Sequence, residues 1–175
     1  MSRRAVAARR NAEVRAFTLI LGALAIFAGA PRPSAAQARA LRVSYSVRAL
    51  DGTEVRVGAG QSVTLVAVFA TWCTTCRSEF ATLDSLRTAL AQRGVRVVAL
   101  GVDQGDDSRV RRFAAARAGG VLVAHDASGA VGRTFGTVGV PESYLVDSTG
   151  VVRWHAQGEL RGAIPSLRRA LAALR

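Results

Sequence analysis

The sequence predicts an α/β domain in which a central mixed β-sheet is covered by helices on both faces. Two apolar runs, at residues 62–70 and 95–102, are rich in β-branched side chains and match strands that are buried on both faces. Apolar residues at helical spacing separate these runs, and a hairpin pattern and a last amphipathic helix follow near the C-terminus. This order of strand, helix, strand, hairpin and helix is typical of a mixed sheet.

The segment before the first buried run is expected to form a short β-hairpin. Residues 41–47 and 54–57 alternate between apolar and polar side chains, and Asp51 and Gly52 between them are a turn signal. The helix after the first buried run is expected to end at Gly94, which can cap its C-terminus. The inner face of this helix carries Phe80, Leu83, Leu86 and Leu90.

The second half of the chain continues the same alternation of helices and strands. The acidic turn at 103–107 can cap the helix that follows it. The turn at 147–150 joins two strands into a hairpin. The expected elements are helices at 108–118, 128–135 and 163–174, and strands at 121–124, 142–146 and 151–156.

Composition limits the classes of protein to which the chain can belong. The chain has 175 residues, of which half are hydrophobic, and this is enough for one globular domain with an apolar core. Its formal charge is +12, and every basic residue is arginine. Such an excess can indicate a nucleic-acid-binding patch, but the arginines are scattered and aromatic residues are not interleaved among them. We therefore expect no nucleic-acid partner.

The first 38 residues have the layout of a secretory signal peptide. The apolar run at 17–30 is shorter than the roughly 20 residues of a membrane-spanning helix, which favours cleavage; an uncleaved inner-membrane anchor is the alternative. We expect residues 39–175 to form one domain in the periplasm or another extracytoplasmic space, where disulfides persist. The positive charges before the run are Arg3, Arg4, Arg9, Arg10 and Arg15.

Cys73 and Cys76 are the only cysteines of the chain and stand two residues apart at the start of the expected helix. A structural zinc site normally has four Cys or His ligands, and no second pair follows, so no metal site is predicted. Exposed N–H groups and the helix dipole favour a thiolate at Cys73, which is expected to be the attacking nucleophile, with Cys76 as the resolving thiol. A permanent structural disulfide is the alternative, although so short a loop would restrain little of the unfolded chain.

Two segments resemble a known family of exported proteins. Residues 69–79, F-A-T-W-C-T-T-C-R-S-E, resemble the W-A-T-W-C-x-x-C-R-x-E active-site segment of the TlpA/ResA/DsbE (CcmG) group of thioredoxin-like proteins. Residues 139–147, G-V-P-E-S-Y-L-V-D, resemble the group's G-x-P-E-T-F-L-I-D segment. The resemblance covers residues 41–172 and implies a thioredoxin-like fold with an N-terminal β-hairpin.

The resemblance also implies roles for residues around the cysteine pair. Pro141 would be a cis-proline facing the disulfide, and the backbone of Val140 would pair with an extended substrate peptide; an ordinary trans-proline is the alternative. Glu142 follows Pro141 and is expected beside the substrate site, or else is a surface acid at a strand edge. Trp72, directly before the pair, is expected to shield one side of the site.

Glu79 stands one helical turn after the second cysteine. The resemblance implies that its carboxylate exchanges protons with the thiols and raises their pKa. The alternative is a solvated acid paired with Arg77 or Arg87. Ala67 stands six residues before Cys73, where thioredoxin carries a buried Asp, so Glu79 would be the substitute acid.

The resemblance implies an exported thiol–disulfide oxidoreductase that reduces substrate disulfides through Cys73 and Cys76, with this redox-active disulfide and no other cofactor. The implied partners are protein thiols or disulfides, including apocytochrome c or its thiol carrier during cytochrome c maturation, and a membrane electron donor of the DsbD/CcdA type. One alternative is periplasmic disulfide exchange unrelated to cytochrome c. Another is a thioredoxin-fold copper chaperone whose Cys73 and Cys76 thiolates bind Cu(I), with or without one histidine. His125 and His155 are otherwise expected to be structural or surface residues.

Overall fold

The computed structural model describes residues 40–174. The expected signal segment at 1–38 lies outside the described residues and stays a prediction. None of the helices among residues 40–174 is both long and apolar enough to cross a membrane.

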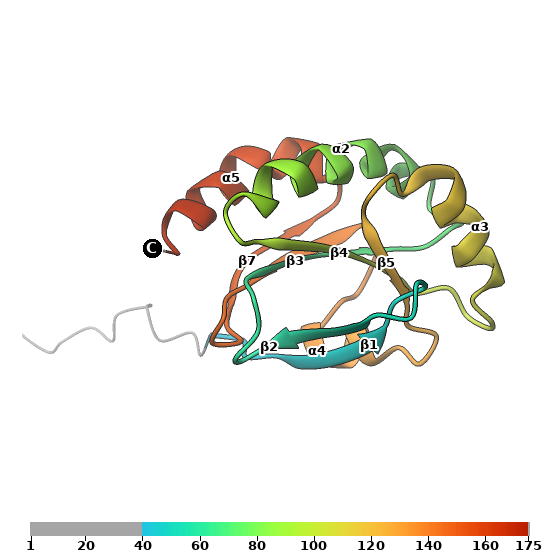
Figure 1. The fold of residues 1–175 in the computed structure, drawn as a ribbon, viewed down its shortest axis with the longest axis horizontal. Helices are drawn as coiled ribbons and strands as arrows, with labels where there is room; N and C mark the ends of the chain where they lie inside the picture. Colours follow the sequence, from blue (N-terminus) through green and yellow to red (C-terminus); the bar gives the residue numbers. More distant parts are fainter. Residues whose placement is uncertain (1–39, 175) are drawn as a thin grey trace, which may run out of the picture. The chain divides into compact units, whose positions relative to one another are not determined.

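A five-stranded mixed sheet forms the centre of the fold (Figure 1). Its strand order is β5-β4-β3-β6-β7. β3 runs parallel to β4 and β4 runs parallel to β5, whereas β6 is antiparallel to both β3 and β7. The expected mixed sheet is therefore confirmed. The strands are β3 (Thr64–Phe69), β4 (Arg96–Gly101), β5 (Leu122–His125), β6 (Glu142–Val146) and β7 (Val152–Gln157).

β3 lies between β4 and β6 and is buried along its whole length. Leu65, Ala67 and Phe69 belong to one apolar cluster, while Val66 and Val68 belong to another. Successive side chains of a strand point to opposite faces of the sheet, so these two clusters lie on the two faces. The continuous apolar run in the sequence is explained by this two-sided burial.

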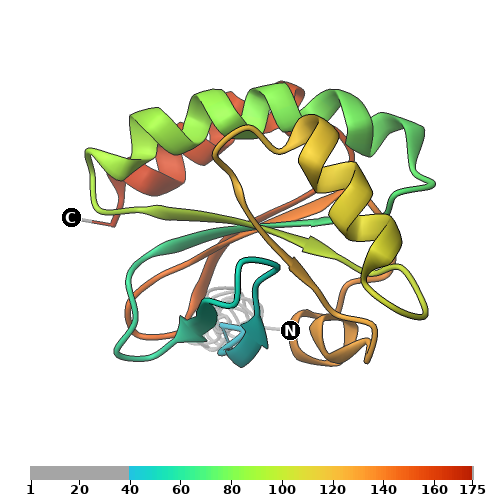
Figure 2. The ribbon, with the colours of Figure 1, turned by 45° about the vertical axis from the view of Figure 1, so that its right-hand side comes forward.

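Both faces of the sheet are covered, as expected (Figure 2). One face carries three helices, α2 (Thr74–Ala91), α3 (Ser108–Arg117) and α5 (Leu160–Ala172). The other face carries the short helix α4 (Ala130–Phe135) and an antiparallel hairpin of β1 (Ser44–Arg48) and β2 (Glu54–Gly58). The expected N-terminal hairpin is therefore confirmed.

The largest differences from the expected helix ends, of three residues each, lie at the end of α2 and the start of α5. α2 ends at Ala91, and Gly94 lies in the turn that follows, with a φ of 69°. α5 begins at Leu160 and not at Ala163. A contact from another helix accounts for this early start, because Leu160 is buried and its N–H donates a hydrogen bond to the carboxylate of Glu79 on α2.

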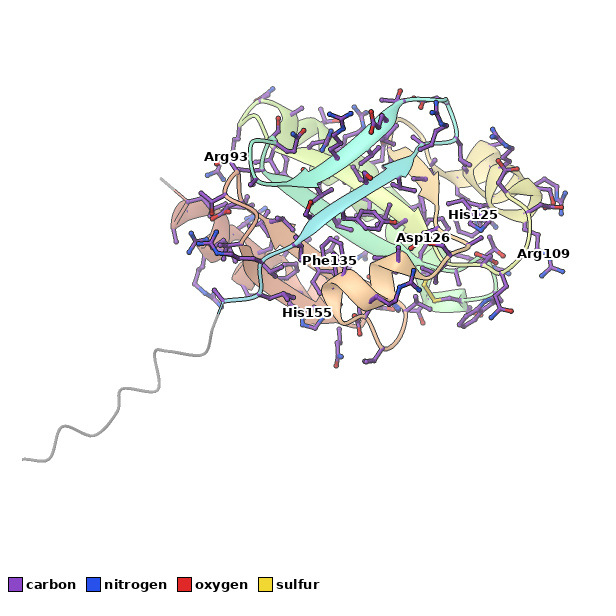
Figure 3. The ribbon with its side chains drawn as sticks, turned by 90° about the horizontal axis from the view of Figure 1, so that it is seen from below. Arg93, Arg109, His125, Asp126, Phe135 and His155 are labelled. Carbon is purple, nitrogen blue, oxygen red and sulfur yellow. A yellow bond between two sulfur atoms is a disulfide. The ribbon has the colours of Figure 1, made fainter. Side chains whose placement is uncertain are left out.

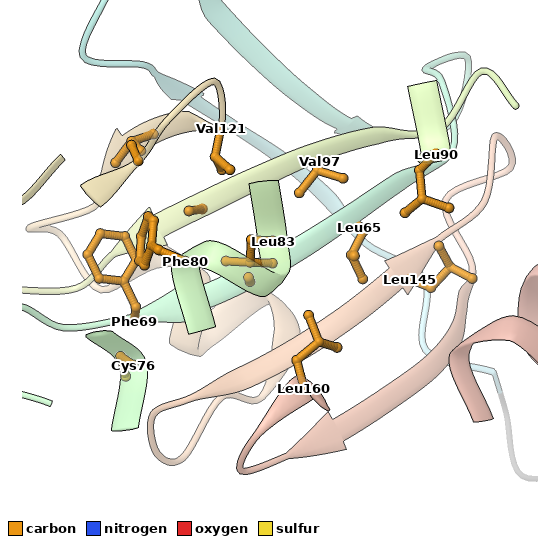
Figure 4. Packing of buried hydrophobic residues seen from close by; sticks show 14 of the residues in the cluster. Leu65, Phe69, Cys76, Phe80, Leu83, Leu90, Val97, Val121, Leu145 and Leu160 are labelled. Atoms are coloured by element: carbon orange, nitrogen blue, oxygen red, sulfur yellow. The ribbon is translucent and has the colours of Figure 1, made fainter. Parts of the chain in front are cut away.

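Aromatic side chains from three elements pack beside the cysteine pair. Phe69 of β3, Phe80 of α2 and Phe113 of α3 have ring centroids between 4.9 and 5.2 Å apart. Figure 4 shows Phe69 and Phe80 close to Cys76. Phe80 packs edge-to-face on the other two rings, and Phe69 and Phe113 are stacked; both arrangements add to the hydrophobic gain from burial. The cluster therefore holds the first half of α2 against the sheet.

Replacing Phe80 should test this anchoring. Phe80 is almost fully buried, and we expect Phe80→Ala to lower the free energy of unfolding by about 3–5 kcal/mol. Ser85→Ala, at an exposed position of the same helix, should change it by less than about 0.5 kcal/mol. Urea unfolding followed by circular dichroism measures both values. Equal effects of the two substitutions would show that the cluster does not anchor α2.

Candidate active site

The cysteine pair lies where the chain leaves β3 and enters α2. Cys73 is the N-cap residue of α2, and Cys73 and Cys76 form a disulfide with a Cα–Cα distance of 5.3 Å (yellow bond in Figure 3). The N–H of Cys76 donates a hydrogen bond to Sγ of Cys73 at 3.0 Å. An N–H donor and the positive end of a helix dipole both favour a thiolate over a thiol. The geometry thus suits an attacking sulfur at Cys73 and a more deeply buried partner at Cys76, which has no exposed surface.

Asp103 fixes the backbone just before the pair. Its buried carboxylate accepts hydrogen bonds from both the N–H and the side-chain hydroxyl of Thr71. The guanidinium of Arg77 donates to the carbonyl oxygen of Thr71 at 3.1 Å. The turn that carries Trp72 and Cys73 is therefore held from two sides.

The acidic turn at 103–107 does lead into α3, with Asp107 as the N-cap residue, but Asp103 binds Thr71 and not the helix. The carboxylate of Asp106 accepts the N–H of Ser108 at the start of α3 instead. In the sequence, Asp103 stands two residues after β4, the strand that pairs in parallel with the strand before the cysteines. The carboxyl ends of parallel strands meet at one edge of a sheet, so such an acid can reach the turn after β3.

The peptide bond between Val140 and Pro141 is cis, and not trans. Val140 lines an open groove of about 280 Å³ together with Trp72. Val138 lines the same groove and is 84% exposed, and Trp72 is 68% exposed. The structure therefore places two exposed apolar side chains and the segment before Pro141 around one groove, and one of these side chains belongs to Trp72, which directly precedes Cys73.

Glu79 is buried, with an exposed fraction of 5%. Burial raises the pKa of its carboxyl above the ordinary value of 4.5; the N–H of Leu160 opposes this shift, and the nearby charge of Glu159 adds to it. The expected alternative of a solvated acid paired with arginine is wrong. Arg77 binds the backbone before the cysteines, and Arg87 pairs with Asp84.

Glu142 is also buried, with an exposed fraction of 2%, so the alternative of a surface acid is wrong. Its carboxylate accepts hydrogen bonds from the N–H of Val138 and from the side chains of Tyr144 and Gln157. Glu142 thus contacts the segment that lines the groove from within the fold.

The polar contacts of the two histidines are with acidic residues and not with the cysteines. Nε2 of His125 lies 2.7 Å from the carbonyl oxygen of Asp103, and Nε2 of His155 lies 3.6 Å from the carboxylate of Glu142. Within residues 40–174, no group of three or more His, Cys, Asp or Glu side chains is arranged to hold a metal ion. Ala67, where thioredoxin has its Asp, is buried in the apolar cluster under α2.

The chain is similar to proteins of a known family. The family model described as Redoxin matches residues 28–171. The thiol:disulfide interchange protein DsbE of Tatumella citrea is 36% identical over 103 residues, which cover 57% of this chain and 52% of that protein. DsbE of Escherichia coli K12 is 35% identical over 98 residues, or 55% and 50% of the two chains. The chain thus spans about half the length of the curated relatives that it matches.

Solved structures confirm the thioredoxin-like fold. A crystal structure assigned to DsbE from Chlorobium tepidum superposes with a TM-score of 0.67 at 24% identity, covering 77% of this chain and 96% of the other. StoA from Bacillus subtilis superposes with a TM-score of 0.60 at 19% identity, covering 69% and 91%. At these identities the likeness concerns the fold alone.

The raised pKa of Glu79 predicts a pH dependence of stability. A carboxyl whose pKa is raised by folding stabilises the native state below its ordinary pKa, and this contribution is lost as the pH rises through the folded-state pKa. Glu79→Gln keeps an oxygen that can accept the Leu160 N–H but cannot ionise. We therefore expect the free energy of unfolding of the unchanged chain, minus that of Glu79→Gln, to fall as the pH rises from about 4 to about 8.

Urea unfolding of the oxidised protein at a series of pH values measures this difference. Glu54→Gln is the matched control, because Glu54 is an exposed acid of β2 whose pKa is lowered by its hydrogen bond to Arg56. The same subtraction for Glu54 should show no fall with pH. A difference for Glu79 that is independent of pH would contradict the assignment of a raised pKa.

Proposed function

Because the chain belongs to the Redoxin family, we propose that it is an exported thiol–disulfide oxidoreductase that reduces substrate disulfides through Cys73 and Cys76. The observation that carries this proposal is the disulfide at the N-terminus of α2, in which the Cys76 N–H donates to Sγ of Cys73. Trp72, the residue before Cys73, lines an exposed apolar groove. The names of the DsbE relatives, thiol:disulfide interchange proteins, describe the same chemistry.

The reaction is a two-electron exchange between two dithiol/disulfide pairs. The Cys73 thiolate attacks one sulfur of the substrate disulfide, which forms a mixed disulfide and releases the other substrate sulfur as a thiolate. The Cys76 thiolate then attacks Sγ of Cys73 and displaces the first substrate sulfur. The products are the Cys73–Cys76 disulfide and a substrate dithiol, and the two protons of the enzyme dithiol pass to the substrate sulfurs.

Glu79 is suited to accept the proton that Cys76 must lose. It lies one helical turn after Cys76 on α2, and burial raises the pKa of its carboxyl toward the range in which it can exchange protons near neutral pH. It also lines a polar surface pocket with Ser78 and Thr82, through which protons can exchange with solvent. We propose Glu79 as the acid–base group of the dithiol.

The groove is suited to an extended peptide. Pro141 has no N–H, and the backbone of the preceding, half-buried Val140 can pair with a peptide as an added strand would. Trp72 and Val138 offer apolar surface to the side chains of that peptide. We therefore propose Trp72 and Val140 as substrate-binding residues, with Pro141 as the proline facing the disulfide.

The similarity to DsbE supports a narrower substrate class. We propose that the substrate is the oxidised C-x-x-C-H haem-attachment segment of apocytochrome c, or its thiol carrier, during cytochrome c maturation. A membrane electron donor of the DsbD/CcdA type would then reduce the enzyme again. This role places the domain in the periplasm or another extracytoplasmic space, with residues 1–38 removed as a signal peptide or kept as an anchor. General disulfide exchange in the same compartment is the alternative.

Trapping of the mixed disulfide tests the assigned roles of the cysteines. Reduced Cys76→Ser protein should form a stable covalent adduct with insulin through Cys73, because the resolving thiol is missing. Intact-mass spectrometry under non-reducing conditions detects the adduct. Cys73→Ser is the matched control and should give at least about tenfold less adduct, because Cys76 is buried. The absence of an adduct with Cys76→Ser would reject the proposed oxidoreductase.

The direction of electron flow follows from the redox potential. A reductant should have a Cys73–Cys76 potential closer to the roughly −270 mV of thioredoxin than to the roughly −120 mV of DsbA. Equilibration with dithiothreitol and glutathione buffers measures it. The reduced protein should also convert an oxidised C-x-x-C-H peptide to its dithiol. A potential near that of DsbA would show that the protein acts as an oxidant.

A further inference from the structure

A buried carboxylate contacts the wall of the substrate groove that residues 137–140 form. Glu142 follows Pro141 at the start of β6, and its exposed fraction is only 2%. Its Oε1 accepts hydrogen bonds from the N–H of Val138 at 3.3 Å and from Nε2 of Gln157 at 3.1 Å. One of its oxygens therefore connects the groove wall to β7.

The second carboxylate oxygen of Glu142 contacts the groove wall indirectly, through the hydroxyl of Tyr144. Oε2 of Glu142 accepts a hydrogen bond from the hydroxyl of Tyr144, and that hydroxyl lies 3.0 Å from the hydroxyl of Thr137. The ring of Tyr144 is stacked on His155, with ring centroids 4.5 Å apart. Figure 3 shows His155 and Phe135 on the face of the sheet that carries α4 and the hairpin. The network therefore lies on that face and contacts Thr137 and Val138 of the groove wall.

Val140 holds one end of the groove wall by packing against both apolar clusters, whereas the side chain of Val138 belongs to neither cluster. Residues 136–141 belong to no helix or strand, and the side chain of Val138 is 84% exposed. An exposed side chain gains little from burial, so this part of the wall depends on its polar tethers. The tethers from Thr137 and Val138 both end at the network of Glu142 and Tyr144.

A carboxylate is costly to bury unless hydrogen bonds compensate it. Each hydrogen-bond donor around Glu142 belongs either to the groove wall or to the paired strands β6 and β7. We infer that Glu142 and Tyr144 are positioning residues that hold residues 137–140 in the geometry that an extended peptide requires. This inference rests on the proposed function, and it replaces direct substrate contact by Glu142 with an action through Val138 and Thr137.

The test compares a substrate that needs the groove with one that does not. The first is a synthetic peptide with one intramolecular disulfide, and the second is the small disulfide 5,5′-dithiobis(2-nitrobenzoate). For Glu142→Met, which removes both acceptors at similar length, the ratio of kcat/KM for the peptide to that for the small disulfide should fall about tenfold to hundredfold, mainly through KM. Glu142→Gln, which keeps one acceptor oxygen, should restore part of the ratio.

Asp147→Asn is the matched control. Asp147 is a buried carboxylate in the turn that follows β6, and it accepts hydrogen bonds from the N–H groups of Thr149 and Val151. Its replacement disturbs a buried acid of the same hairpin without touching residues 137–140. The substrate ratio should therefore stay at the value of the unchanged chain, whereas a general loss of stability would lower the ratio in both variants alike.

Hydrogen exchange measured by mass spectrometry gives a readout that does not depend on activity. Exchange in the peptide that contains residues 137–140 should be faster in Glu142→Met than in the unchanged chain. A folded Glu142→Met protein with an unchanged substrate ratio and unchanged exchange would overturn the inference while leaving the oxidoreductase intact. If the unchanged chain reduced neither disulfide, the proposed function would be rejected instead. Faster hydrogen exchange at residues 137–140 in Glu142→Met would even then support the hydrogen bonds from Glu142 as the contacts that hold this segment.

If Glu142→Met does not fold, Tyr144→Phe tests the same inference in its place. This substitution removes only the hydroxyl that contacts Glu142 and Thr137. It should lower the same substrate ratio by a smaller factor and speed exchange at residues 137–140. A folded Tyr144→Phe protein that changes neither quantity would overturn the inference.

Discussion

The burial of β3 on both faces is the constraint on which the rest of the structure depends. Because every residue of this strand is buried, polar chemistry can begin only where the chain leaves the sheet. That point is also the N-terminus of α2, where Cys73 caps the helix. The covering elements follow from the same constraint, since α2, α3 and α5 bury one face of the strand while α4 and the hairpin bury the other.

Three buried carboxylates then connect the segments around the cysteines. Asp103 binds Thr71 before the pair, Glu79 binds the first N–H of α5, and Glu142 binds Val138 in the groove wall. In each case a backbone N–H donates to the carboxylate, which compensates part of the cost of removing the acid from water. The site is thus held by polar contacts that join distant segments, while the apolar clusters hold the sheet and helices beneath it.

The surroundings of the buried acids shift their pKa values in opposite directions, as Glu79 and Asp147 show. Glu79 receives a hydrogen bond from one backbone N–H and lies near the negative charge of Glu159, and burial raises its pKa. Asp147 receives several hydrogen bonds and lies beside Arg153, which lower its pKa to about 2. An acid with few donors is suited to proton exchange, whereas one with many donors serves structure. This contrast favours Glu79 as the acid of the proposed reaction.

Residue order was enough to predict the strands, the hairpin and the cysteine pair at the start of α2, because these depend on local periodicity and on neighbouring residues. It did not predict that α5 begins at Leu160, or which groups bind Asp103 and Glu142, since those partners come from segments far apart in the chain. The sequence does not indicate whether a given glutamate is buried or exposed. Glu54 is exposed and Glu142 is buried because β6 packs between β3 and β7 in the folded sheet, and tertiary packing alone makes that distinction.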